Sequence, residues 1–347
     1  MKTSISLVST QMQLINCVES INATGCTQND LIIYSATEST RDTIVELLNT
    51  SSYKRVFNSI HVIFVKYSSP IKNFKAIIKY RLCLRNLLNN SYDVCILGNY
   101  LYDMYRYFIM KVSSRNHNCK MILIDDGMAA LNISKVRAEE LTSRKVKFEF
   151  SSLINKCLLS SRKLKNYIIP KLEFHTNLNF ATIGNDIYVN QQYDFIKNNN
   201  QGLEIKDIDW TEYSGVFLGQ PLVKLKYCSF DNYNENLFRV LQIHKKIIYV
   251  PHPAEDVMQI NKEYLKDILI VKSKFSFEIL MSTIPTSIKI YSFNSSVLAN
   301  VRKMGYNNKL EAIYYSDIKK LDDNMQIKLL NVYKYFESIN IPVFYNE

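Results

Sequence analysis

The sequence predicts an α/β protein built from two Rossmann-like halves in tandem. In both halves short apolar, β-rich runs alternate with amphipathic segments, which is typical of parallel sheets covered by helices. The 347 residues suffice for two domains that each bury a core, and 47% of them are hydrophobic. Neither half carries a GxGxxG or GxxxxGK[ST] loop. We therefore expect a ligand in a cleft between the carboxyl ends of the strands, held without the usual phosphate loops.

The first half shows five βα units within about 130 residues. A stretch with little periodicity follows, over residues 133–207, and we place the domain boundary at its end, which gives domains 1–207 and 208–347. Strands are predicted at Ile5–Val8, Leu31–Tyr34, His61–Val65, Val94–Leu97 and Met121–Ile124, and helices at Met12–Ile21, Arg41–Leu48, Phe74–Leu88 and Tyr102–Val112.

In the second half the alternation of strands and helices resumes. Strands are predicted at Val216–Leu218, Lys246–Val250, Leu269–Val271, Ile288–Tyr291 and Leu310–Tyr314. Helices are predicted at Glu235–Ile243, Asn261–Ile268, from Ser276 onward, at Ser296–Met304 and over the long pattern Asp317–Ile339.

Basic residues outnumber acidic ones, and the formal net charge is +11. This balance favours an anionic partner such as a nucleic acid, a membrane surface or an acidic glycan. The abundance of Lys, Asn, Ile and Tyr equally fits an AT-rich coding sequence, which needs no partner. No helix-turn-helix, zinc-finger or RNP-like motif is present, so we expect no nucleic acid partner. A basic nucleic-acid-binding protein is kept as the alternative from a different class.

Residues 54–90 carry eight basic side chains and no acid. Lys75 and Lys79 share one face of a predicted helix, which favours docking on an anionic membrane, with a solvated helix face as the alternative.

The seven cysteines are scattered without a CxxC pair, which is typical of reduced thiols. With neither a signal peptide nor an apolar stretch long enough to span a bilayer, we expect a cytoplasmic protein that is either soluble or peripheral on the inner face of the cytoplasmic membrane.

The strand Met121–Ile124 runs directly into Asp125, Asp126 and Gly127. The residue after such a strand points into the crevice of an open sheet, where two adjacent carboxylates can supply a general base. An ordinary Asp-Gly turn is the alternative.

A second strand, Ile247–Val250, ends in Pro251-His252-Pro253. The two prolines restrict the backbone around His252, whose imidazole can then hydrogen-bond a leaving phosphate. A third signal is the pair Ser295-Ser296 at a predicted helix start, where hydroxyls and free N–H groups form an anion site. Simple helix capping is the alternative for the serines.

The order and spacing of these motifs, with Glu278 lying 26 residues beyond His252, resemble the bacterial sialyltransferases. The similarity is to the lipooligosaccharide sialyltransferase family and to its relatives, the polysialyltransferases and the multifunctional marine sialyltransferases. The segments Leu7–Asn16 and Val216–Leu222 look like that group as well, so the resemblance spans both halves.

This resemblance implies a GT-B architecture, in which two Rossmann-like domains face a central cleft. It also implies an inverting, metal-independent transfer of sialic acid from CMP-sialic acid. The domain 1–207 would supply the general base to the acceptor, and the domain 208–347 would bind the CMP-sugar. Asp125 is the implied base, with Asp126 as the fallback, and His252 would assist the departure of CMP.

The resemblance also implies the donor-binding residues. Glu278 would accept hydrogen bonds from the ribose hydroxyls, Ser295 and Ser296 would hold the phosphate, and Gly127 would let the backbone approach the ligand. The remaining members of the implied donor site are Pro253, Thr10 and Gln11.

The expected acceptor is a galactose-containing surface glycan of a bacterium, such as lipooligosaccharide, O-antigen or capsule. We expect no cofactor and no metal, because the leaving group of a CMP-sugar is already a phosphate monoester. A transferase of another CMP-nonulosonic acid, such as legionaminic acid or Kdo, is the nearer alternative. The segment 133–207 matches nothing in the resemblance, and acceptor specificity and the contacts of a homodimer are expected there.

Overall fold

The computed structural model describes residues 1–35, 37–50, 52–64, 70–125, 133, 136–140, 142, 171–176, 186–199, 208–255 and 259–345. The chain divides into two compact units, Met1–Gln201 and Gly202–Glu347. The boundary predicted at residue 207 falls in residues 200–207, which lie outside the described ranges.

The first unit holds a parallel sheet of seven strands in the order β3-β2-β1-β4-β5-β6-β7. Its first five strands occur where the sequence predicts them. The strands are β1 (Thr3–Val8), β2 (Gln28–Ser35), β3 (Ser59–Phe64), β4 (Val94–Leu97), β5 (Lys120–Ile124), β6 (Leu172–His175) and β7 (Ile187–Val189). The helices are α1 (Gln11–Thr24), α2 (Glu38–Thr50), α3 (Pro70–Leu87), α4 (Asp103–Arg115) and α7 (Asp194–Asn199).

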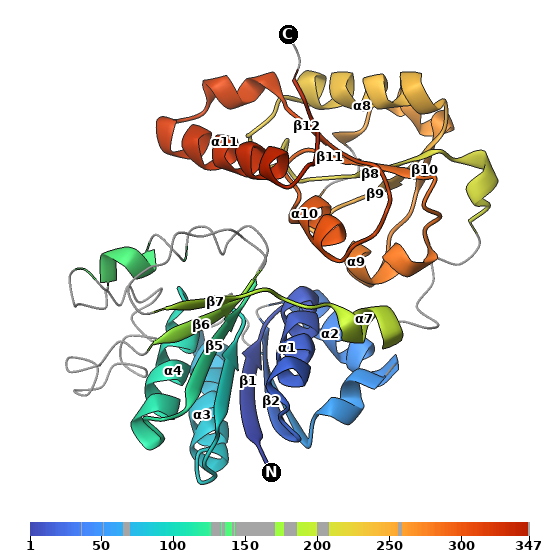
Figure 1. The fold of residues 1–347 in the computed structure, drawn as a ribbon. Coiled ribbons are helices and arrows are strands. Elements are labelled where there is room, and N and C mark those ends of the chain that lie inside the picture. Colours follow the sequence, from blue (N-terminus) through green and yellow to red (C-terminus); the bar gives the residue numbers. More distant parts are fainter. Residues whose placement is uncertain are drawn as a thin grey trace. The chain divides into compact units, whose positions relative to one another are not determined.

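Helices cover both faces of this sheet. Figure 1 shows α1 and α2 on one face and α3 and α4 on the other. The strand order reverses at β1, and right-handed crossovers then place the later helices on the opposite face. Side chains from α3, α4 and the strands form a core whose members include the fully buried Ile5, Tyr80 and Phe108.

The second unit holds a parallel sheet of six strands in the order β10-β9-β8-β11-β12-β13. With its strands numbered from its own start, this is again the order 3-2-1-4-5-6 of a Rossmann fold. The strands are β8 (Gly215–Leu218), β9 (Ile247–Val250), β10 (Ile268–Ile270), β11 (Lys289–Ser292), β12 (Leu310–Ile313) and β13 (Val343–Phe344). The α-helices are α8 (Phe230–His244), α9 (Phe277–Leu280), α10 (Ser296–Lys303) and α11 (Asp323–Ser338).

Three predicted helices of this unit are wrong in type or length. The segment predicted as a helix at Asn261–Ile268 is a 3-10 helix, Lys262–Asp267, because β10 begins directly after it. The helix predicted from Ser276 is the single turn α9, followed by a 3-10 turn. The long pattern Asp317–Ile339 breaks in two, because the side chain of Asp322 accepts a hydrogen bond from the Met325 amide and starts α11 there.

The segment predicted as irregular supplies β6, β7 and α7. An ion pair buried within it joins the Arg137 guanidinium to both oxygens of Asp186, at 2.9 and 3.0 Å. Asp186 also accepts a hydrogen bond from the Leu172 amide at the start of β6. These contacts join residues far apart in sequence and hold β6 beside the 136–140 helical turn.

Within the described residues, no helix has both the length and the apolar character that crossing a bilayer requires.

Candidate active site

His252 lies in an exposed turn that follows β9. Its Nδ1 accepts a hydrogen bond from the Ala254 amide at 3.1 Å, so the neutral ring carries its proton on Nε2. The surrounding protein removes part of the ring's hydration, which lowers the pKa of His252. A neutral imidazole that presents Nε2–H is suited to donate a hydrogen bond to an anion.

Glu255 holds this turn, although the sequence analysis did not single it out. Its Oε2 accepts a hydrogen bond from the His252 amide at 2.8 Å, and its own amide donates to the His252 carbonyl at 2.8 Å. Its Oε1 accepts from Tyr233, Tyr249 and Gln259. Burial raises the pKa of Glu255 to about 6, against the lowering effect of these hydrogen bonds. The signal in the sequence was a glutamate three residues after the histidine of a strand-end turn.

Gly219 follows β8 and packs against the same carboxyl group. A Cβ at this position would lie 2.1 Å from Oε2 of Glu255 and 2.4 Å from the hydroxyl of Tyr249. Only glycine leaves room here, so Gly219 allows Glu255 to reach the His252 turn.

Ser295 and Ser296 begin α10 after β11, as predicted, but the structure gives them different positions. Oγ of Ser295 accepts a hydrogen bond from the Val297 amide at 3.3 Å, so this buried hydroxyl caps the helix. Ser296 is half-buried in the first turn, and its hydroxyl has no hydrogen-bond partner among the described residues. The amino end of α10 with the Ser296 hydroxyl is therefore a candidate anion site.

Glu278 lies in α9 and is only 4% exposed. Its Oε1 accepts a hydrogen bond from Nδ2 of Asn300 on α10 at 2.8 Å. Burial raises the pKa of this carboxyl, which the hydrogen bond partly offsets. Glu278 thus joins α9 to α10, the two short helices seen side by side in Figure 1.

The carboxyl ends of β9, β8 and β11 bring these groups to one edge of the second sheet. Val250 pairs with Leu218, and Leu218 pairs with Ser292, so the three strands end level with one another. The strand order reverses between β8 and β11, and this is where α/β sheets bind their ligands. Pro253, in the turn after β9, lies at the same edge.

The first unit places Asp125 at the carboxyl end of β5. The residue is 6% exposed, and its carbonyl accepts a hydrogen bond from Nδ2 of Asn16 at 3.0 Å. Asp126 and Gly127 lie outside the described residues, so the choice between the two carboxylates stays a prediction.

Thr10 and Gln11 stand at the turn between β1 and α1. Oγ1 of Thr10 accepts a hydrogen bond from the Gln13 amide at 3.1 Å and caps α1. The side-chain amide of Gln11 donates to the Thr43 carbonyl at 2.9 Å, which ties α1 to α2. Gln13, which the sequence analysis missed, is fully buried and accepts a hydrogen bond from the Ser9 amide at 2.7 Å.

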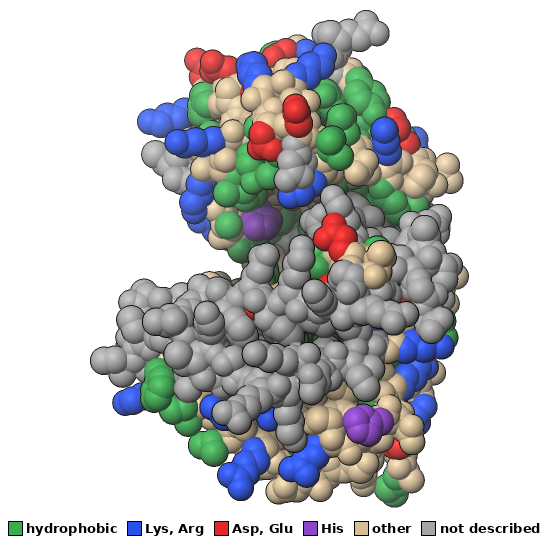
Figure 2. All heavy atoms as spheres, turned by 90° about the vertical axis from the view of Figure 1, so that its left-hand side faces the viewer, with side chains coloured by type: hydrophobic (Ala, Val, Ile, Leu, Met, Phe, Trp, Pro, Cys, Tyr) green, Lys and Arg blue, Asp and Glu red, His purple; other side chains and the backbone are tan. Residues whose placement is uncertain are grey.

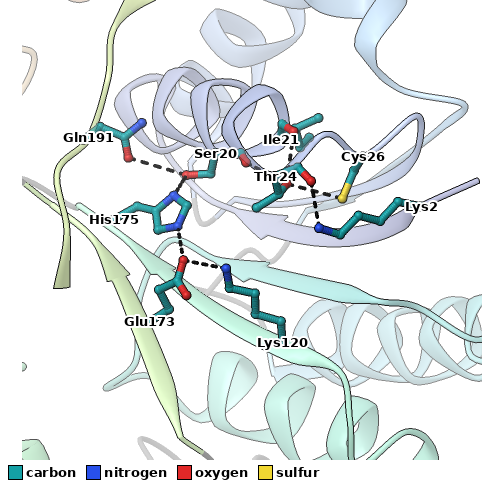
Figure 3. Close-up of polar contacts among 9 residues, drawn as sticks. All are labelled: Lys2, Ser20, Ile21, Thr24, Cys26, Lys120, Glu173, His175 and Gln191. Carbon is teal, nitrogen blue, oxygen red and sulfur yellow. Dashed lines mark hydrogen bonds and ion pairs between the residues drawn. The ribbon is translucent and has the colours of Figure 1, made fainter. Parts of the chain in front are cut away.

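A chain of polar side chains crosses the interior of the first unit. Figure 3 shows Ser20 of α1 beside His175 of β6, followed by Glu173 and Lys120. Oγ of Ser20 lies 2.8 Å from His175 Nδ1, and His175 Nε2 lies 2.8 Å from Glu173 Oε1. Burial lowers the pKa of His175, which the Glu173 carboxylate partly offsets.

This Ser-His-Glu order is that of a nucleophilic triad, but Ser20 and His175 are 0% and 2% exposed. A substrate has no access to a hydroxyl that is buried to this extent, so the chain of side chains connects α1 to β6. Burial raises the pKa of Glu173, yet hydrogen bonds from Lys120 and His175 outweigh it and the pKa lies below its usual value. Lys120 and Glu173 form an ion pair of 2.7 Å.

Among the described residues, no group of three or more His, Cys, Asp or Glu side chains is arranged to hold a metal ion.

Comparison with known proteins gives one family and a set of related folds. A family model described as alpha-2,8-polysialyltransferase (POLYST) matches residues 4–310. The comparison with curated proteins gave no match.

The solved structures that resemble the chain are distant in sequence. Phytolacca americana UGT2, complexed with UDP-2fluoro-glucose and pterostilbene, has a TM-score of 0.50 at 12% identity, covering 100% of this chain and 86% of that one. The UDP-GlcNAc 2-epimerase from Methanocaldococcus jannaschii has a TM-score of 0.48 at 14% identity, covering 96% and 92%. The E. coli ADP-heptose lps heptosyltransferase II has a TM-score of 0.42 at 10% identity, covering 90% and 85%. At 12% identity, the likeness to Phytolacca americana UGT2 concerns the fold alone. That fold is the two-domain GT-B fold.

Proposed function

The chain belongs to the alpha-2,8-polysialyltransferase family and is a sialyltransferase-type glycosyltransferase, and from this premise we propose that it transfers sialic acid from CMP-sialic acid to a hydroxyl of a bacterial surface glycan. A glycosyltransferase takes a sugar donor and a glycan acceptor. The observation that carries the proposal is the family match over residues 4–310. Two of the groups gathered at the edge of the second sheet support it, because the His252 imidazole and the amino end of α10 with Ser296 suit the binding of a phosphate.

In the proposed reaction the acceptor hydroxyl attacks the anomeric carbon of the donor, and the bond from that carbon to the phosphate oxygen breaks. The carboxylate of Asp125 takes the proton of the hydroxyl, with Asp126 as the alternative base. CMP leaves as a phosphate monoester, and attack from the opposite side inverts the anomeric centre. The carboxylate of the sugar itself stabilises the developing positive charge, so we propose a transfer without a metal ion.

The second unit would stabilise the leaving CMP. Nε2–H of His252 is the proposed donor to the phosphate, since the Ala254 amide occupies Nδ1. The Ser296 hydroxyl and the amino end of α10 would hold other phosphate oxygens. Glu278 is the proposed partner of the ribose hydroxyls. Because it is buried and bonded to Asn300, it would also fix the position of α10.

The family description indicates a candidate acceptor as well. In place of a galactose-containing glycan, the acceptor would be the terminal sialic acid of a growing chain, extended through α-2,8 linkages. If this acceptor is correct, the protein should transfer sialic acid to oligosialic acid but not to a lactose-containing acceptor. The reverse preference would favour the galactose-containing glycan.

The donor and the metal requirement are tested with a panel of CMP- and UDP-sugars in the presence of EDTA. We expect CMP release from CMP-sialic acid, and not from CMP-Kdo or CMP-legionaminic acid. An absolute need for a divalent ion, or a preference for a UDP-sugar, would contradict the proposal.

The roles of Asp125 and His252 are tested by Asp125→Ala and His252→Ala. Each variant should lower kcat by about 10² or more, the scale of losing an acid or a base. The control variants Asp42→Ala and His117→Ala remove exposed residues of the same types and should leave kcat unchanged. Circular dichroism would verify the fold, and full activity in a site variant would reject the role given to that residue.

A further inference from the structure

A groove of about 560 Å³ lies between α3 and α4 of the first unit. Four cations line it: Arg81 and Arg85 from α3, and Lys111 and Arg115 from α4. The two residues from each helix are four apart and therefore lie on the same helix face. None of the described residues that line the groove is acidic. The groove thus collects positive charge from two helices.

Three of these cations are available to a ligand. Arg81, Arg85 and Arg115 are exposed, and none of the three has an ion-pair partner among the described residues. Arg85 and Arg115 stand in the last turns of their helices, where the helix dipole favours a cation. The helix dipole therefore explains the positions of Arg85 and Arg115. It does not explain Arg81, which lies further from the helix end.

Apolar side chains lie along the same helix. Phe74, Ile78 and Leu82 follow one another at intervals of four residues, so they form one stripe on α3. Phe74 and Leu82 are 45% and 53% exposed, and Ile78 and Leu82 also line the groove. Figure 2 views the molecule from the side on which α3 and α4 lie in Figure 1, and there Lys and Arg side chains stand beside hydrophobic ones over the described part of the unit.

We propose that the groove between α3 and α4 binds the phosphate headgroups of anionic phospholipids and docks the first unit on a membrane surface. Arg81, Arg85, Lys111 and Arg115 contact the phosphates, while Leu82 and Phe74 enter the boundary of the acyl chains. A helix with a basic flank and an exposed apolar stripe binds lipid in this way.

The lining favours a lipid over an acidic glycan. A glycan presents many hydroxyl groups, which need acceptors as well as donors. Apart from the cations, the described residues that line the groove offer only the hydroxyls of Ser114 and Tyr107 as polar side-chain groups. A phospholipid headgroup needs donors for its phosphate and apolar contacts for its chains, and the groove supplies both. This surface does not depend on which sugar the protein transfers.

Vesicle sedimentation tests the proposal with the full chain. The protein should bind vesicles that contain phosphatidylglycerol, bind pure phosphatidylcholine vesicles much less, and dissociate as salt is raised. The combined variant Arg81→Gln, Arg85→Gln, Lys111→Gln and Arg115→Gln should partition at least roughly a hundredfold less onto the anionic vesicles, since each basic residue near such a surface contributes several-fold.

A matched control removes the same charge elsewhere. Lys262→Gln, Lys266→Gln, Lys328→Gln and Lys334→Gln change exposed residues of the second unit and should keep vesicle binding within a few-fold. Leu82→Gln should weaken vesicle binding, whereas Leu225→Gln, at a residue that is 50% exposed, should not. All variants should transfer sugar to a soluble acceptor as the unaltered chain does.

Three results would overturn the proposal: no binding of the unaltered chain to anionic vesicles, undiminished binding of the four-residue groove variant, or an equal loss in the control. If the groove variant keeps vesicle binding but loses affinity for soluble oligosialic acid, the groove is a glycan site and the proposal is wrong. Vesicle binding is measured without any donor sugar. Its outcome therefore does not depend on whether the proposed transfer reaction is correct.

Discussion

Glu255 illustrates how a single buried carboxyl group can determine the geometry of a site. One oxygen fixes the backbone of the His252 turn, and the other accepts hydrogen bonds from three side chains. The turn itself is recognisable in the sequence, because two prolines flank a histidine after an apolar strand. The glutamate that holds it is not, since its partners Tyr233 and Tyr249 come from other elements and look like ordinary core residues.

Gly219→Ala should damage the site through this carboxyl group. The new methyl group would collide with Oε2 of Glu255, so the carboxyl must move and the His252 turn with it. We expect a loss of about 1–3 kcal/mol in the free energy of unfolding, the usual cost of overpacking, and at least a tenfold fall in kcat. Urea unfolding and steady-state kinetics measure the two effects.

Gly25→Ala serves as the control for this variant. Gly25 ends α1 with φ of 68°, and apart from its chain neighbours and the backbone of its own helix no atom of the described residues lies within 4 Å of an added Cβ. This change should cost about 1 kcal/mol of stability through backbone strain alone and leave kcat unaltered. If Gly219→Ala behaves in the same way, the coupling of Gly219 to the turn is refuted.

Glu255 should also make stability depend on pH. Its pKa of about 6 in the folded chain exceeds the ordinary value of 4.5, so the folded state binds this proton more tightly than the unfolded state. The free energy of unfolding should therefore fall as pH rises from about 4.5 to 6, by up to about 2 kcal/mol, and then level off.

Glu255→Gln should remove this part of the pH dependence, measured by urea unfolding at several pH values across that interval. The control Glu235→Gln removes a carboxyl group at an exposed residue, so it produces the same change in net charge. Parallel pH profiles for Glu255→Gln and the unaltered chain would contradict the assignment.

At the scale of elements, α10 separates two roles that the sequence assigned jointly. Ser295 and Ser296 were predicted together as holders of the phosphate. The helix begins where expected, but the hydroxyl of Ser295 serves as its cap. Sequence alone cannot decide which of two adjacent serines is the cap, because that depends on where the backbone first turns helical.

Ser295→Ala should lower the free energy of unfolding by about 1 kcal/mol, the usual cost of a lost cap. Ser296→Ala should change stability by less than about 0.5 kcal/mol, because this hydroxyl has no hydrogen-bond partner among the described residues, yet raise the KM for the donor. Urea unfolding and donor titration of the two variants give the comparison. An unchanged donor KM in Ser296→Ala would remove this residue from the proposed site.

The regular elements were predictable because their signals are local. Each of the first five strands is a short apolar run, and β4 was predicted to the residue at Val94–Leu97. The strands β6 and β7 gave no such signal, since Glu173 and His175 interrupt the apolar run of β6 and β7 has only three residues. Their place in the sheet rests on long-range contacts such as the Arg137–Asp186 ion pair, 49 residues apart, which periodicity does not reveal.

At the scale of the whole molecule, each unit repeats the same strand order, and the family match confirms the predicted resemblance to bacterial sialyltransferases and polysialyltransferases. The predicted GT-B fold is confirmed as well. Low glycine content did not prevent two Rossmann-like sheets, and among the described residues Gly98, Gly215 and Gly219 each stand where an added Cβ would lie 3.0 Å or closer to a neighbouring side chain. The site roles remain predictions, because they depend on a ligand.

Binding of CMP to the full chain should protect one unit from hydrogen exchange and not the other. We expect slower exchange at the carboxyl ends of β8, β9 and β11 and at the start of α10, where the proposed phosphate contacts lie, and in α9, which carries the proposed ribose partner Glu278. Mass spectrometry of peptides with and without CMP would measure this. Protection centred on the β1–α1 turn instead would place the nucleotide in the first unit.

The fit of Gly219 beneath Glu255 has a consequence for evolution within the family. Because a side chain at 219 and a carboxyl group at 255 exclude each other in space, the two positions should covary among relatives. A homologue with alanine at the first position is expected to carry a shorter side chain at the second and to hold its histidine turn by other means. A lineage that leaves the glycine and glutamate pair would therefore change position 255 first, and one that acquires the pair would change position 219 first, since either opposite order leads through a collision.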